Sequence, residues 1–105
     1  MSETITARLP LTRWQGDRGT YHLVTFRGAE AETLAGHALM HKLEFGKRGG
    51  FGSVKVMARI GATTWNTSVF PQEAQSEWIL LVSRKVMRAE DLAPGDERDV
   101  TLRLL

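Results

Sequence analysis

Hydrogen-bonding side chains recur at alternate positions in one segment of the sequence, at Thr64, Asn66 and Ser68. On a strand, residues two apart project from the same face, so these two hydroxyls and one amide are expected to form a row. Downstream, the Arg88 guanidinium offers two parallel hydrogen bonds to a carboxylate or a phosphate. We therefore predict a site for a small polar or anionic ligand, or for a partner protein, made of Thr64, Trp65, Asn66, Ser68, Lys85 and Arg88. In the alternative interpretation this strand faces solvent and Arg88 pairs with an acidic residue of the following turn.

A basic segment between Lys42 and Arg59 carries five cations and a single acid, Glu44. Within it, Phe51 follows a run of glycines and half matches a strand signature of RNA-binding domains, in which two aromatic rings stack on bases. Ser53 stands at the second aromatic position, so one ring is missing. The second hypothesis is a nucleic-acid-binding barrel that uses Lys42, Lys47, Arg48, Phe51, Lys55 and Arg59. In the alternative interpretation, the glycines form a loop that leads into a strand and Phe51 covers the core. The cations then belong to a solvated surface of mixed charge.

His37 and His41 stand four residues apart on a predicted helix, the spacing of two zinc ligands in a metalloprotease signature. The glutamate that acts as general base in that signature is replaced by Ala38, so the pair is predicted to be a surface feature. The sequence has no nucleophile elbow and no cysteine, and His22, on a predicted strand, is assigned a structural role. We predict no catalytic residue, no metal site and no cofactor, and an enzyme is the third hypothesis.

The composition is that of one folded domain. The chain has 105 residues, of which 42% are hydrophobic and 25% charged, and its formal net charge is +2. This balance favours a globular chain with one core over a disordered chain. The lack of cysteine, of a signal peptide and of a long apolar run predicts a cytoplasmic protein that does not enter a membrane. We expect residues 1 to 105 to form a single β-barrel domain.

Two strands are predicted in the first quarter of the chain. Apolar residues occupy every second position from Ile5 to Leu11, which predicts a strand over residues 5 to 14. Pro10 places this strand near an edge or a bulge. After a turn rich in glycine, residues 20 to 26 carry aromatic and β-branched side chains and return as the second strand of a hairpin.

The apolar period changes after Gly28. At the angular spacing of a helix, one side of this segment gathers Ala31, Leu34, Ala35, Ala38 and Leu39. This pattern predicts an amphipathic helix of about four turns that ends near Gly46. We expect its apolar side to plug an open end of the sheet.

The second half of the chain is predicted to be mostly strand. Residues 54 to 60 and 63 to 70 alternate in hydropathy around a turn at Gly61 and form a hairpin. Residues 78 to 82 are so apolar that both faces of this strand are expected to be covered. Residues 86 to 92 form a short helical turn, and a last strand places on one face Val100, Leu102 and Leu104.

These elements together predict a mainly β protein. We expect a small closed or nearly closed barrel of about six mostly antiparallel strands, with one α-helix between the second and third strands. Closure is favoured because it leaves no exposed sheet edge.

The order of the pieces in the second half resembles that of a known family. A tight hairpin, an apolar strand, a basic stretch and a Gly-Asp turn follow one another, marked by Gly61, Trp65, Ser68, Trp78, Lys85, Arg88, Gly95 and Asp96. This order is similar to that of a bacterial and archaeal family catalogued as domain of unknown function nineteen-oh-five. The resemblance covers roughly residues 5 to 104.

The resemblance implies a small closed barrel of about six strands. It further implies a protein that stands alone or is joined to a domain associated with bacteriocin protection, and it implies no established activity. The chain departs from the family pattern in two places. Residues 72 to 76 replace a glycine-rich connection, and the proline usual just before the helix is missing near Arg27.

Overall fold

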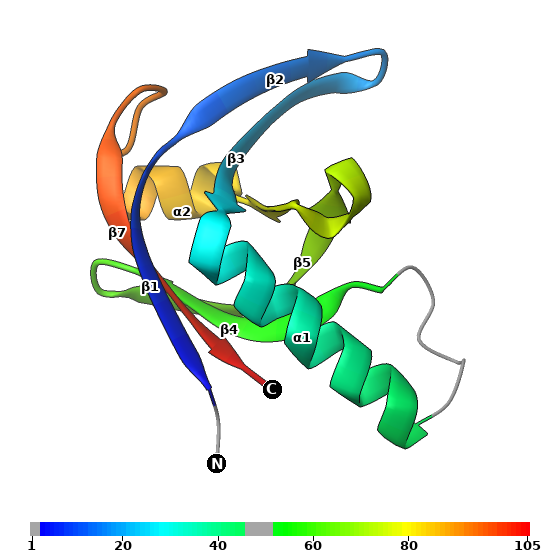
Figure 1. Cartoon of the computed structure of the whole chain (residues 1–105). Coiled ribbons are helices and arrows are strands. Elements are labelled where there is room, and N and C mark those ends of the chain that lie inside the picture. Colours follow the sequence, from blue (N-terminus) through cyan, green and yellow to red (C-terminus); the bar gives the residue numbers. More distant parts are fainter. Residues whose placement is uncertain (1–2, 46–51) are drawn as a thin grey trace.

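The computed structural model describes residues 3 to 45 and 52 to 105, which form a curved sheet and two α-helices (Figure 1). Along the chain the elements are β1 (Thr4–Pro10), β2 (Thr12–Gly16), β3 (Gly19–Arg27), α1 (Gly28–Phe45), β4 (Val54–Ile60), β5 (Thr63–Gln72), the 3-10 helix η2 (Glu73–Gln75), β6 (Glu77–Leu81), α2 (Arg84–Ala89) and β7 (Glu97–Leu104). The prediction of a mainly β protein with one main helix is confirmed.

The strands form one antiparallel sheet in the order β1-β7-β4-β5-β6-β3-β2. The sheet curls into a half-barrel in Figure 1, with the β2–β3 hairpin at the top. Its two outermost strands, β1 and β2, are consecutive in the chain and are separated only by Leu11. The backbone at Leu11 therefore joins the two edges of the sheet.

The structure divides the predicted first strand at Leu11, so the described residues form seven strands instead of about six. The Leu11 N–H donates to the Asp96 carbonyl at 2.9 Å, and the Leu11 carbonyl accepts from the Gly95 N–H at 2.7 Å. The preceding residue, Pro10, has no N–H to contribute to a strand ladder. At this point the backbone therefore binds the turn before β7, and the chain passes from one sheet edge to the other.

The apolar alternation of the strands defines the concave face of the sheet. Its largest fully buried side chains are Trp78 and Phe26, each 0% exposed, and they belong to one core cluster. On β6 the inner row is buried, but Leu81 on the opposite face is 39% exposed. The prediction that both faces of this strand are covered is wrong, because Leu81 projects to the convex side of the sheet.

Helix α1 covers the concave side through its first half. Ala31 and Leu34 are buried in the same cluster as the strand residues. The expectation that Leu39 shares this buried side is wrong, since Leu39 is 56% exposed. The second half of α1 extends away from the sheet in Figure 1, and its large apolar side chains Leu39, Met40 and Leu43 are exposed. None of the described helices is both long enough and apolar enough to cross a membrane.

Helix α2 lies below the β2–β3 hairpin and is fixed at both ends. At its start, the Ser83 side chain accepts a hydrogen bond from the Val86 N–H at 3.3 Å, as an N-cap residue does. Val86 itself is buried in the core. After its last turn, the Glu90 carboxylate accepts a hydrogen bond from the Thr63 hydroxyl at 2.5 Å and lies against Gly61 of the β4–β5 turn.

Candidate anion-binding site

A shallow pocket of about 350 Å³ opens between β3 and α2. We call it the α2 pocket, and it is lined by His22, Arg84, Met87, Arg88, Asp91 and Leu92. Most of these residues come from α2 and the turn that follows it, and only His22 comes from the sheet. The pocket therefore depends on how α2 is held against the β2–β3 hairpin.

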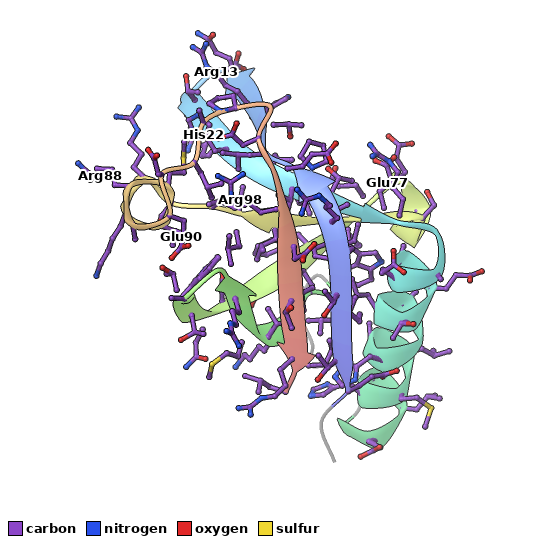
Figure 2. All side chains as sticks on the ribbon, turned by 90° about the vertical axis from the view of Figure 1, so that its left-hand side faces the viewer. Arg13, His22, Glu77, Arg88, Glu90 and Arg98 are labelled. Atoms are coloured by element: carbon purple, nitrogen blue, oxygen red, sulfur yellow. The ribbon has the colours of Figure 1, made fainter. Side chains whose placement is uncertain are left out.

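The hairpin supplies His22 and brings a further cation close to it. His22 shares the inner face of β3 with the buried Val24 and Phe26, so it continues the core row to the mouth of the half-barrel. Arg13 of β2 lies directly opposite His22 in the strand register. Because opposite residues of an antiparallel pair project from the same face, Arg13 stands beside His22, as Figure 2 shows.

Helix α2 supplies two guanidinium groups, from Arg84 and Arg88. Residues four apart on a helix are neighbours on its surface, so both side chains share one side of α2. Both are exposed, and within the described part of the chain neither makes a hydrogen bond or an ion pair. Because their hydrogen-bond donors are unoccupied by the protein, they are available to an external acceptor.

The charges around the pocket favour an anion. Arg84 and Arg88 contribute two positive charges to the lining, against a single lining carboxylate, Asp91. Arg13 of β2 adds a further cation opposite His22. Arg98 is also near α2 in Figure 2, but its guanidinium donates to the Glu97 carbonyl at 2.9 Å and is therefore engaged. The pocket thus holds a net positive charge from groups that are not neutralised locally.

The remaining lining residues add an apolar surface. Leu92 is buried and Met87 is half-buried, and both contact the hydrophobic core. The lining contains a histidine and a carboxylate but no hydroxyl or thiol side chain that could act as a nucleophile. The arrangement can bind and orient an anionic group next to an apolar one.

The structure separates the residues of the predicted ligand face. Arg88 lines the α2 pocket, whereas Lys85 is exposed on α2 outside the lining. On β5, the alternate residues Thr64, Asn66 and Ser68 do share a face, but it is the convex face of the sheet, away from the core. Trp65 projects to the other side and packs against the core.

The residues of the nucleic-acid hypothesis are divided as well. Lys55 and Arg59 project from the convex face of β4, opposite Ser68 and Thr64 of β5. Lys42 is exposed in the last turns of α1. The other three residues of this hypothesis lie outside the described part of the chain: Lys47, Arg48 and Phe51.

The histidine pair of α1 is not brought to other metal ligands. The His37 Nε2 lies 3.3 Å from the carbonyl oxygen of Leu105, where the two can share a hydrogen bond. Within residues 3 to 45 and 52 to 105, no group of three or more His, Cys, Asp or Glu side chains converges.

Of the lining residues, only Arg88 was among the predicted ligand-binding residues. The side chains with nitrogen donors that were missed are His22 and Arg84. His22 was assigned a structural role because its strand context gave no sign of what covers it. Arg84 was missed because the short helix was expected to begin at residue 86, whereas Ser83 caps it and it begins at Arg84. The N-cap serine followed by arginines four residues apart is a signal that could have identified the pair.

Comparison with known proteins identifies one family. Residues 8–102 match the family described as Domain of unknown function (DUF1905). The match extends from within β1 to within β7, so it includes part or all of every strand and both helices. Among curated proteins, no sequence is similar enough to count as a match.

Proposed function

The chain belongs to the family described as domain of unknown function (DUF1905), and from its own geometry we propose a non-enzymatic binding domain that holds a small anion in the α2 pocket. The observation that carries this proposal is the pair Arg84 and Arg88. Two guanidinium groups stand one helical turn apart beside His22, without partners among the described residues. Such groups bind carboxylates and phosphates through charge-assisted hydrogen bonds.

The pocket also limits the size and character of the ligand. A volume of about 350 Å³ is near the lower end of the range of ligand-pocket volumes. We therefore expect a small ligand with at most a few rings. Met87 and Leu92 favour a ligand with an apolar part next to its anionic group. A small aromatic or aliphatic carboxylate, or a compact phosphate ester, has both features.

Isothermal titration calorimetry with benzoate and with inorganic phosphate tests the proposal. We expect saturable binding of both probes, with benzoate tighter because it also covers Met87 and Leu92. Arg88→Gln keeps a polar, hydrogen-bonding side chain, although a shorter one, and removes its charge. It should weaken binding by about 1.5 to 3 kcal/mol, or roughly 10- to 150-fold, with no change in melting temperature.

Arg18→Gln is the matched control, because Arg18 is an exposed arginine of the β2–β3 turn and does not line the pocket. It should leave both affinities unchanged. The proposal is wrong if neither probe binds saturably at low ionic strength, or if the two arginine variants weaken binding equally.

A further inference from the structure

Three cations of the convex face occupy consecutive rows of the sheet. In the register of β4 and β7, Met57 lies opposite Arg103 and Arg59 lies opposite Thr101. Lys55, Arg103 and Arg59 therefore stand on three successive outward rows, alternating between the two strands. Successive rows are two residues apart, which is about 7 Å along the strands. We call these three residues the cation ladder.

The ladder faces away from the core. On β4, the alternate residues Val54, Val56, Ala58 and Ile60 are buried, so Lys55 and Arg59 project outward. On β7 the buried row likewise leaves Arg103 on the outer side. All three side chains are exposed. Figure 2 looks onto this side of the molecule, with β1 and β7 nearest the viewer.

The charge of the ladder is not neutralised within the described chain. Lys55 and Arg103 make no side-chain hydrogen bond or ion pair there, and Arg59 donates only its Nε, to the Gly61 carbonyl at 2.8 Å. The terminal amino groups of Arg59 therefore stay available. The neighbouring acid on β7, Asp99, is engaged by Arg8 at 3.5 Å.

Neutral hydrogen-bonding groups and one aromatic ring surround the ladder. Asn66 lies opposite Met57, and Ser68 lies opposite Lys55. Thr101 lies between Arg59 and Thr6 of β1. One row beyond Ser68, Phe70 projects from the same face of β5 and is 37% exposed.

We propose that this convex face of β7, β4 and β5 binds a single-stranded nucleic acid, a site separate from the α2 pocket. The row spacing of the ladder is comparable with the distance between successive phosphates along a single strand, so Lys55, Arg103 and Arg59 each meet one phosphate. The Phe70 ring lies one row past the ladder, where it stacks on a base. A regular line of cations ending at an exposed ring fits a strand of phosphates and bases better than it fits a protein or a lone anion.

Fluorescence anisotropy with a labelled oligothymidylate at low salt tests this site. Single strands lose affinity with a slope of about −0.7 on a log–log plot against salt for each phosphate contact. The wild type should therefore show a slope of about −2, and Arg59→Gln/Arg103→Gln should show about −0.7. Phe70→Leu, which keeps an apolar side chain but removes the ring, should weaken binding about five- to a hundredfold without changing the slope.

Arg18→Gln/Lys85→Gln is the matched control, because it removes the same charge from exposed positions outside the ladder. Its slope should equal that of the wild type. The proposal is overturned if the oligonucleotide does not bind, if the control lowers the slope as much as the ladder variant, or if poly-glutamate binds as tightly and Phe70→Leu has no effect.

Discussion

At the scale of single residues, Gly61 shows how closely α2 is fitted to the sheet. Its φ is +59°, which is a left-handed conformation, and a Cβ atom there would collide with the Glu90 carboxylate. Gly61→Ala is therefore expected to destabilise the fold by about 1 to 3 kcal/mol. Urea unfolding followed by tryptophan fluorescence measures this loss, and an unchanged midpoint would contradict the packing described here.

The same substitution, glycine to alanine, is expected to have the opposite effect on stability at Gly36. Gly36 lies in the middle of α1 at an exposed position, and a Cβ atom there would touch nothing within 4 Å. Because alanine favours the helix over glycine, Gly36→Ala should stabilise the protein by about 0.5 to 1 kcal/mol. The same urea experiment tests it, and a lower midpoint would mean that another surface covers this part of α1.

From the sequence, one residue of the candidate site could be selected, but not the arrangement of the site. Arg88 was selected because a guanidinium is suited to an anion, and this residue lines the α2 pocket. Thr64, Asn66 and Ser68 were correctly placed on one face of a strand, yet alternation cannot say whether that face is concave or convex. His22 could not be identified from the sequence, because it lines a pocket only as a result of how α2 packs against the β2–β3 hairpin.

At the scale of elements, α1 should depend on its first half for stability. Leu34 is 0% exposed, whereas Leu43 is 70% exposed on the same helix. Leu34→Ala removes a buried side chain and should cost about 2 to 5 kcal/mol. Leu43→Ala should stay within about 0.5 kcal/mol of the wild type. Thermal unfolding of the two variants compares their stabilities. Equal losses of stability would mean that α1 does not pack against the sheet as described.

Helix α2 should depend on its cap for both stability and binding. Ser83→Ala removes the acceptor of the Val86 N–H and should cost about 1 kcal/mol. Because the cap orients Arg84 and Arg88, anion affinity should also fall although Ser83 is not in the pocket lining. Calorimetry measures this against Ser53→Ala, an exposed serine before β4. An unchanged affinity would mean that the arginines do not need an ordered α2.

Strand and helix periods were sufficient to find most elements. The strand at residues 54 to 60 and the helix from Gly28 agree with the structure. The division of the first strand at Leu11 was not foreseen, because it results from hydrogen bonds to the distant turn at Gly95 and Asp96. Local patterns do not contain that information.

At the scale of the whole molecule, the strand order determines which residues become neighbours on the surface of the sheet. β7 lies between β1 and β4, so the last strand of the chain joins the first strand to the β4–β5 hairpin. This pairing creates the cation ladder, since Arg103 reaches β4 only through it. No periodicity in the sequence indicates that Arg103 belongs with Lys55 and Arg59, and the sequence-based grouping therefore omitted it.

The fold thus presents two cationic surfaces of different character. The α2 pocket is small, partly apolar and lined mainly by α2 and the turn that follows it, whereas the ladder is open and regular. Variants of one surface should leave binding at the other unchanged, because their residues share no contact among those described.

The most direct measurement is a nuclear magnetic resonance titration of the ¹⁵N-labelled full chain with benzoate, mapped onto the backbone amides. We expect saturable shifts that are largest at His22 and at residues 84 to 92, and we expect Arg88→Gln to abolish them. Saturable shifts concentrated elsewhere, for example along β4 and β7, or no shifts at all, would contradict the assignment of the α2 pocket as an anion-binding site.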